Sequence, residues 1–381
     1  MRTEQLDWTA GAGWQAAAPA LEGAQLVLVF GATDRLDGER FAELRARYPA
    51  AILFGCSSAG EIHDTRVSDD TVTATAARFD ATPLALARQE VAADADSRAA
   101  GRALAARLPA TGLAHVLVLS DGLHVNGTDL VDGLQEALPA GVRVTGGLAG
   151  DGARFQRTLV MADAPPAEHL VAAVGFYGDH IRVGHGSLGG WDSFGPERLI
   201  TRSRGNVLYE LDGRSALDLY KQYLGEHAAG LPATGLLFPL ALREGEAGGE
   251  WEGAGLVRTI LAVDEAAQSM TFAGDMPEGS HARLMKANFD RLIEGASGAA
   301  VAAKGSLRGH GAELAVLISC VGRKLVLKQR IEEEVEGVRA VLGDGAALTG
   351  FYSYGEISPY TPTARCELHN QTMTITTLSE A

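Results

Sequence analysis

Short apolar runs alternate with amphipathic stretches along most of the chain. Gln25 to Phe30, His115 to Leu119 and Leu314 to Ser319 are runs of the kind that form buried strands. Each is followed by apolar residues at helical spacing and then by a second apolar run. This pattern predicts an internally duplicated strand-helix-strand unit in an α/β protein with mixed α+β sheets.

A glycine-containing frame follows the second apolar run in two of these units. Residues 54–62 (FGCSSAGEI) and 350–357 (GFYSYGEI) share the pattern Gly-x-x-Ser-x-Gly-Glu-Ile, and residues 146–152 (GGLAGDG) form another glycine-dense turn with an acid. Glycine allows a sharp turn or a close backbone approach. We therefore predict that these turns lie at equivalent ends of packed units and that a small ligand binds in the crevice between them.

The two glutamates of the frame, Glu61 and Glu356, are predicted to grip a cationic group or to hydrogen-bond across the crevice. The alternative is that both acids cap solvent-facing turns. Hydroxyl groups and glycines of the same turns complete the predicted ligand-binding set. It consists of Cys56, Ser57, Ser58, Gly60, Glu61, Gly147, Asp151, Tyr352, Gly355 and Glu356.

Cys56 and Ser57 also suggest a hydrolase with a nucleophile at a strand-to-turn junction. No His or Asp partner stands at a recognisable spacing, and the second frame has Phe351 in place of Cys56, so a buried small residue is favoured. The turn at 146–152 lacks the Lys-Ser/Thr of a phosphate loop, and Asp151 would repel phosphate.

Composition changes to Gly, Ser and Trp at residues 184–196, where we place a domain boundary. A chain of 381 residues is long for one domain, and the predicted organisation is an extension (1–20) and two domains (21–190 and 191–381). Further predictions are a hairpin or meander of Thr71–Phe79 with Pro83–Ala87, an edge or irregular strand at Gly235–Leu242, a mobile loop at Glu244–Gly253, and a helix capped by Ser280.

A formal net charge of −15 argues against binding to nucleic acid or to an anionic membrane surface. No window reaches the roughly 18 apolar residues of a membrane span, and residues 1–20 lack the pattern of a secretory signal. The three cysteines lack metal-type spacing and suit a reducing compartment. The expected location is the cytoplasm.

The motifs together resemble those of proteins with an N-terminal and a C-terminal FIST domain, from about Gln25 to the end of the chain. The resemblance rests on residues 55–62, 120–122 (SDG), 146–151, 190–191 (GW), 319–323 (SCVGR), 350–357 and 369–372 (HNQT). It implies an intracellular sensory protein that is not an enzyme. It also adds His369 and Asn370 to the predicted ligand-binding residues, and implies that a separate partner such as a histidine kinase carries the output. A homodimer is left open.

Free-standing two-domain FIST proteins resemble the nitric oxide sensing proteins, which bind haem and control a histidine kinase. This narrower resemblance implies haem b, bound non-covalently because the chain has no Cys-x-x-Cys-His. The predicted axial ligand is His281, beside Leu284, Met285 and Phe289 as an apolar helical wall; His124 and His185 lie at other strand ends. The alternatives are a haem-free sensor of amino acids or related small metabolites and, second, a Cys/Ser hydrolase.

Overall fold

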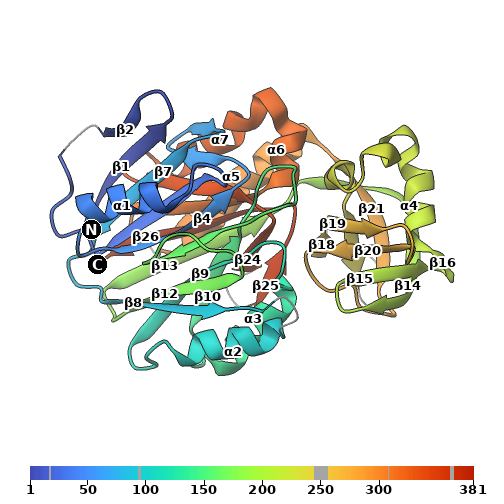
Figure 1. Ribbon diagram of the computed structural model, residues 1–381, viewed down its shortest axis with the longest axis horizontal. Coiled ribbons are helices and arrows are strands. Elements are labelled where there is room, and N and C mark those ends of the chain that lie inside the picture. The colour runs from blue at the N-terminus through green and yellow to red at the C-terminus, as the bar shows by residue number, and fades with distance from the viewer. Residues whose placement is uncertain (17–18, 93–95, 244–255, 308, 361–363) are drawn as a thin grey trace.

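The protein consists of a large body joined to a smaller domain (Figure 1). The computed structural model describes residues 1–16, 19–92, 96–243, 256–307, 309–360 and 364–381, so the predicted loop at Glu244–Gly253 lies outside the described residues. Three six-stranded sheets make up the body, and the small domain has its own eight-stranded antiparallel sheet. The predicted mixed α/β class is confirmed.

The body contains three copies of one unit, in which a helical connection joins two parallel strands. The first copy is β3 (Leu26–Ala32), α1 (Gly38–Arg47) and β4 (Ile52–Ser58). The second is β9 (Leu113–Ser120), α3 (Gly127–Ala137) and β10 (Arg143–Leu148). The third is β22 (Leu314–Cys320), α6 (Val321–Leu327), η3 (Lys328–Arg330), α7 (Ile331–Leu342) and β23 (Ala347–Ser353). The repeat predicted from the sequence therefore occurs three times.

Each unit also contributes a short strand to the sheet of another unit. After β4 the chain forms β5 (Glu61–His63), which pairs with β23 of the third unit. After β23 it forms β24 (Gly355–Pro359), which pairs with β10 of the second unit. After β10 it forms β11 (Val160–Ala162), which pairs with β4 of the first unit. The exchange closes a ring of three sheets.

A second exchange follows the same order around the ring. The antiparallel third strands of the three units are β7 (Val72–Arg78), β12 (Leu170–Tyr177) and β26 (Met373–Glu380). The strand after β7, β8 (Leu84–Glu90), pairs with β12, and the strand after β12, β13 (Ile181–Leu188), pairs with β26. The predicted hairpin or meander of β7 with β8 is therefore wrong, because the two strands belong to different sheets.

The two ends of the chain meet where this second exchange closes (Figure 1). β1 (Arg2–Thr9) pairs with β7, and the Met1 ammonium lies 3.1 Å from the Glu313 carboxylate, just before β22. The remaining body elements are the edge strands β2 (Gly13–Ala16), β6 (Arg66–Ser68) and β25 (Cys366–His369), and the helix α2 (Ser97–Ala106) that packs on α3.

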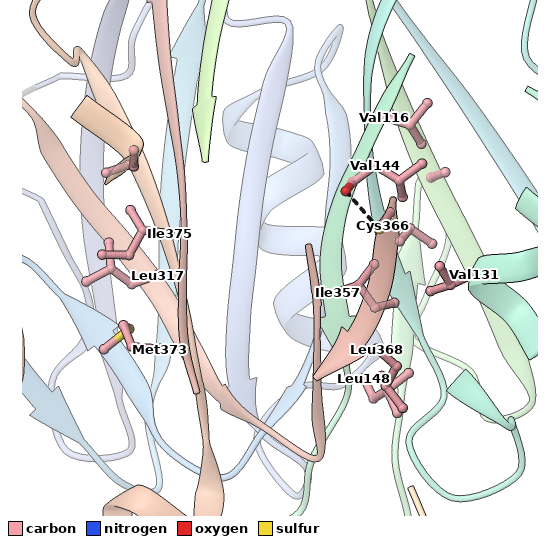
Figure 2. Close-up of a cluster of buried hydrophobic side chains, with 14 of the residues drawn as sticks. Val116, Val131, Val144, Leu148, Leu317, Ile357, Cys366, Leu368, Met373 and Ile375 are labelled. Carbon is pink, nitrogen blue, oxygen red and sulfur yellow. Dashed lines mark hydrogen bonds between the residues drawn. The ribbon is translucent and has the colours of Figure 1, made fainter. Parts of the chain in front are cut away.

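The exchanged strands carry apolar side chains into shared cores. Ile357 of β24 lies with Val144 and Leu148 of β10 and with Leu368 of β25, and Val131 points toward them from α3 (Figure 2). A thiol hydrogen bond of 3.2 Å joins Cys366 to the Val144 carbonyl in the same cluster. Removing this apolar surface from water stabilises the pairing of strands that are distant in sequence.

The first glycine of each turn allows the two parallel strands of a unit to approach closely. A Cβ atom placed on Gly55, Gly146 or Gly350 would lie 1.8 Å from a carbonyl oxygen of the neighbouring strand. These oxygens belong to Val29, Val118 and Leu317, which are the registered partners of the three glycines. The same steric requirement therefore recurs in all three units.

The small domain is inserted between β13 and α5 (Phe289–Ser306), a helix of the body that packs on β13, β26 and α7. Its strands are β14 (Trp191–Arg204), β15 (Val207–Leu211), β16 (Arg214–Ser215), β17 (Leu240–Arg243), β18 (Leu256–Arg258), β19 (Ile260–Asp264), β20 (Ser269–Phe272) and β21 (His281–Ala287). Its helical elements are α4 (Ala216–Leu224), η1 (Gly225–Gly230) and η2 (Ala233–Leu237). The predicted domain limits, after residues 20 and 190, stay predictions, because strand pairing alone does not define a folding domain.

Two predictions for this part of the chain are wrong. Ser280 caps no helix, since the residues after it form β21, and α5 begins at Phe289 with Asn288 as its cap. Helical spacing of Met285 and Phe289 suggested a helix, but β21 pairs with β14 on one side and β17 on the other. For Gly235–Leu242 the edge alternative is wrong, because β17 lies between β18 and β21, whereas the irregular alternative agrees with the structure, since η2 occupies the first part of this range.

A buried ion pair holds the two connections between body and small domain. The Arg323 guanidinium lies 2.8 Å from the Glu334 carboxylate, and both side chains are fully buried. Arg323 also donates to the carbonyls of Gly189, 3.1 Å away, and Leu292, 2.7 Å away. Trp191 and Ala287 are paired neighbours in the sheet, so both connections lie side by side. Among the described residues, no helix is both long and apolar enough to cross a membrane.

Replacing Gly350 by alanine tests the close approach of the strands. Because the new methyl group would overlap the Leu317 carbonyl, we expect Gly350→Ala to lower the free energy of unfolding by more than about 3 kcal/mol. Gly305→Ala is the matched control: this glycine lies in α5 with open space around it, and the change should raise stability by about 0.5 to 1 kcal/mol. Urea denaturation measures both. Equal stabilities of the two variants would contradict the steric argument.

Candidate functional site

The three glycine turns predicted to lie together do meet at the centre of the ring. Backbone hydrogen bonds of 2.8 to 3.1 Å join them in pairs: Ala59 to Tyr352, Tyr352 to Gly60, Gly150 to Ser57, and Tyr354 to Leu148. The structure thus brings together the predicted residues that belong to the three turns. Their roles in binding a ligand stay predictions.

Glu61 is buried and holds two segments of the chain at the first turn. Its carboxylate accepts a hydrogen bond from the Ser58 hydroxyl and two from Thr71, from the hydroxyl at 2.6 Å and from the backbone N–H at 3.3 Å. Burial raises the pKa of Glu61 to about 7, although these hydrogen bonds and the nearby Lys324 ammonium favour the charged form.

Glu356 repeats this arrangement at the third turn. Its carboxylate accepts hydrogen bonds from the Ser353 hydroxyl at 2.6 Å and from the hydroxyl and N–H of Thr372, at 3.0 and 3.1 Å. The side chain is fully buried, which raises the pKa of Glu356 to about 8. Within the described part of the chain, neither glutamate lines any of the clefts considered below. Each acid therefore stabilises the turn from which an exchanged strand begins, β5 for Glu61 and β24 for Glu356.

Asp151 organises the loop after the second turn. Its carboxylate accepts the backbone N–H groups of Phe155, Gln156 and Arg157 at 2.8 to 2.9 Å, and also the Tyr354 hydroxyl. The Phe155 ring stacks on the Tyr354 ring, with centroids 4.7 Å apart. The loop is therefore connected through Tyr354 to the third turn.

The other polar residues of the turns are also buried. Burial raises the pKa of the Cys56 thiol well above its usual range, so the thiolate that a nucleophile requires is disfavoured. The Ser57 hydroxyl accepts the Leu159 N–H at 2.9 Å, and the Tyr352 hydroxyl donates to Glu334 at 2.6 Å. This geometry gives no support to the hydrolase alternative.

At two glycines of the predicted set, Gly147 and Gly355, neighbouring side chains leave no room for a Cβ atom. A Cβ at Gly147 would lie 2.8 Å from the Ile318 side chain, and one at Gly355 would lie 2.9 Å from Leu148 and Leu368. Packing between the units therefore explains why these two positions require glycine.

His369 and Asn370 lie where the body faces the small domain. The Asn370 amide donates to the Tyr354 carbonyl at 3.0 Å and accepts the Thr259 N–H of the small domain at 3.2 Å. His369 is buried beside the Ser358 carbonyl, at 2.9 Å, and burial lowers its pKa to about 4. Asn370 therefore links the third glycine turn directly to the small domain.

Arg258 forms a second link across this interface. Its guanidinium donates to the Leu368 carbonyl of the body at 2.8 Å, to the Thr128 hydroxyl at 3.3 Å and to the Asp275 carbonyl at 3.1 Å. Burial lowers the pKa of Arg258 to about 10. A buried cation with these carbonyl partners fixes how the small domain sits on the body.

A cleft of about 670 Å³ separates the body from the small domain beside these links. This volume is within the usual range for small-molecule sites. The body contributes Asp96, Ser97, His124, Asn126, Asp129, Phe155 and Gln156, and the small domain contributes Arg204, Gly205, Asn206, Leu261, Ala262 and Thr271. We call this the interdomain cleft. Sequence reasoning missed it because its two walls are distant in the chain.

The two walls of the interdomain cleft differ in charge. On the body side, burial and the nearby carboxylates of Asp275, from the small domain, and of Asp96 raise the pKa of Asp129. On the opposite side Arg204 is exposed and, among the described residues, has no ion-pair partner. A ligand in the cleft would therefore meet carboxylates at one end and a guanidinium at the other.

A different cleft, of about 560 Å³, lies within the body between β9, β13 and α5. His115, His185, Arg143 and Ser306 line it together with small and apolar residues, and burial lowers the pKa of His115 to about 3 and that of His185 to about 4. One ring nitrogen of each histidine, Nδ1 of His115 and Nε2 of His185, is buried with no hydrogen-bond partner within the described structure.

His281, the predicted axial ligand, lies in β21 with its Nε2 3.8 Å from a Glu197 carboxylate oxygen. The apolar helix expected beside it does not exist, and within the described residues His281 lines none of the clefts above. The surroundings of His281 do not fit a haem. Haem binding elsewhere stays a prediction.

Two family models together match most of the chain. That of the FIST N domain matches residues 25–214, and that of the FIST C domain matches residues 216–359. The chain belongs to the FIST family. FIST domains are predicted sensory and signalling domains, and the narrower expectations of haem and nitric oxide sensing gain nothing from the match.

Other comparisons give less. No curated protein matches this FIST protein in sequence. One similar solved structure is the crystal structure of cyanuric acid hydrolase from A. caulinodans, with 9% identity, a TM-score of 0.36, and coverage of 100% of this chain and 98% of that chain. We base no argument on a similarity at this level. In the FIST protein, the interdomain cleft is lined by residues of both matched domains, such as Asp129 and Thr271.

The raised pKa values of Glu61 and Glu356 predict how stability depends on pH. A carboxyl group with a higher pKa in the folded state binds its proton more tightly there, so its contribution is complete below the unfolded value of about 4.5 and is lost as pH rises toward 7 and 8. We expect the free energy of unfolding, measured with urea between pH 5 and pH 9, to fall less steeply for Glu356→Gln than for the unmodified protein. Parallel curves would contradict this assignment.

Proposed function

We propose that this FIST protein senses a small zwitterionic metabolite, such as an amino acid, in the interdomain cleft and signals through a separate partner protein. The observation that supports this proposal is the opposed charge of the two walls. The carboxylates of Asp129 and Asp96 suit an ammonium group, and the Arg204 guanidinium suits a carboxylate. A ligand carrying both groups would touch both domains at once.

The contacts around the cleft supply a route from the ligand to the rest of the molecule. Phe155 lines the cleft and stacks on Tyr354, whose carbonyl accepts from Asn370, which in turn binds Thr259 of the small domain. A ligand that draws the walls together would favour one orientation of the small domain over others. A partner such as a histidine kinase would recognise that orientation.

Calorimetry with a panel of amino acids tests the proposal. We expect saturable binding of one or more of them, weakened at least about tenfold by Asp129→Asn and by Arg204→Ala, since each change removes one charge-assisted contact. Analogues that lack either the amine or the carboxylate should bind the unmodified protein as weakly as amino acids bind these two variants.

Arg202→Ala is the matched control, because Arg202 lies two residues from Arg204 on the same strand but pairs with Glu210 at 2.9 Å. This variant should bind as the unmodified protein does. Absence of binding across the panel, or equal loss in Arg202→Ala and Arg204→Ala, would count against the cleft.

A haem-based nitric oxide sensor that regulates a histidine kinase is the second candidate, and the cleft beside His115 and His185 favours it. Two neutral imidazoles with unpartnered ring nitrogens and the apolar neighbours Ile181 and Val183 are the chemistry that an axial position needs. Haem b bound there would supply an iron that takes up a diatomic gas.

An absorbance spectrum of protein produced with added haem decides this candidate. If haem binds in this cleft, a Soret band appears, His115→Ala or His185→Ala shifts or removes it, and His281→Ala leaves it in place. A protein without that band, or a band untouched by both changes, excludes haem from this cleft while leaving the metabolite proposal to its own test.

A further inference from the structure

Three side chains with metal-binding atoms converge at the end of β9. Asp121 directly follows this strand, His124 lies in the same loop, and His169 precedes β12, which pairs with β9. Their ligand atoms all lie within 4.8 Å of one another. The loop geometry brings His169 to this point although it is 48 residues from Asp121 in the chain.

The separation between Asp121 and His124 is close to that of a tetrahedral site, and no ligand atom of the three residues lies more than 4.8 Å from another. His124 Nδ1 lies 3.1 and 3.2 Å from the two Asp121 carboxylate oxygens, and the two imidazole rings have centroids 4.1 Å apart. Donor atoms bound at 2.0 to 2.1 Å around a tetrahedral Zn²⁺ ion lie about 3.4 Å from one another. The side chains need only small movements to share one ion.

One atom in the cluster lacks a partner in the described structure. His169 Nδ1 is buried and makes no hydrogen bond, which is uncommon for a ring nitrogen away from water. The His169 backbone N–H donates to Asp121 Oδ2 at 2.9 Å, so the residue is held in place while its ring nitrogen is left unused. A metal ion would satisfy this lone pair.

Asp121 is fixed by the surrounding backbone before any ion binds. Its Oδ1 accepts the N–H groups of Leu123 and His124, at 2.8 and 3.0 Å, and the Thr158 hydroxyl at 3.0 Å. These contacts orient the carboxylate as outer hydrogen bonds orient ligands in known metal sites. Within the described ranges, the partners of Oδ2 are the His169 N–H and the His124 ring, so this oxygen retains a lone pair for an ion.

We propose that Asp121, His124 and His169 bind one divalent transition-metal ion of the Zn²⁺ type. Two imidazoles and one carboxylate are a ligand set that such ions prefer over Mg²⁺ or Ca²⁺, and three protein ligands leave one coordination position open. The His124 side chain is 32% exposed, which gives the ion an entry path. His124 also lines the interdomain cleft, so the ion would sit at the edge of that cleft. The inference does not depend on the identity of the sensed metabolite.

Metal titration of the full chain, freed of metal with a chelator, tests the site. We expect one equivalent of Zn²⁺ to bind by calorimetry and one equivalent of Co²⁺ to give visible absorbance bands, while Mg²⁺ produces neither signal. Loss of an outer-shell partner weakens metal sites by about 10- to 100-fold, so His124→Ala and His169→Ala should each weaken Zn²⁺ binding by at least about 100-fold.

His180→Ala is the matched control, because His180 is exposed and also lies near a carboxylate, 3.8 Å from Asp179. Its Zn²⁺ affinity and Co²⁺ bands should equal those of the unmodified protein. Circular dichroism establishes which variants are folded, and if His169→Ala does not fold, His124→Ala decides alone. A folded protein that takes up neither Zn²⁺ nor Co²⁺, or variants that bind as the unmodified protein does, would refute the site.

Discussion

The exchange of strands among the three sheets of the body is the constraint on which the rest of the structure depends. β5, β24 and β11 each leave the unit in which they arise and complete the sheet of another, so no sheet of the ring is complete without its neighbours. The chain must cross between sheets inside the protein, where backbone groups have no access to water. Glu61 and Glu356, at the start of β5 and β24, accept hydrogen bonds from the hydroxyl and backbone N–H groups of Thr71 and Thr372, and these bonds offset the cost of burying two carboxyl groups.

The interface with the small domain combines fixed and open regions. Arg258 and Asn370 fix it through buried hydrogen bonds, and the Arg323–Glu334 pair holds the two connecting segments. Such polar networks are demanding because every buried partner must be satisfied, and when they are satisfied they specify one arrangement. The interdomain cleft lies beside these contacts, and its charged groups are exposed or only partly buried. A rigid frame next to an adaptable polar surface is a suitable arrangement for a protein that responds to a ligand.

The sequence predicted the strands of the repeated units well, because residues 26–30, 115–119 and 314–319 of the apolar runs are buried on both faces in the fold. The sequence also predicted that the glycine turns lie close together, as they do in the structure. The destination of each exchanged strand was not predictable, since Glu61–His63 has the same pattern whichever sheet it joins. The helical spacing around Met285 predicted a helix, but this segment forms β21, which is hydrogen-bonded to β14 on one side and to β17 on the other. The cleft and the Asp121 cluster bring together residues that are distant in the sequence, such as Asp129 and Arg204 on the two walls of the cleft, and local patterns do not reveal such neighbours.

Both connections to the small domain pass through one place, where Trp191 and Ala287 are neighbours in a sheet. The ring of three units therefore closes around the two ends of an inserted segment, and residues within that segment, Arg258 and Thr259, form buried hydrogen bonds to the body. Other residues of the segment, such as Arg204 and Thr271, line the cleft instead. Substitution of a cleft residue such as Arg204 would leave the buried hydrogen bonds of Arg258 and Asn370 in place, so the surface of the cleft and the docking of the small domain can change independently.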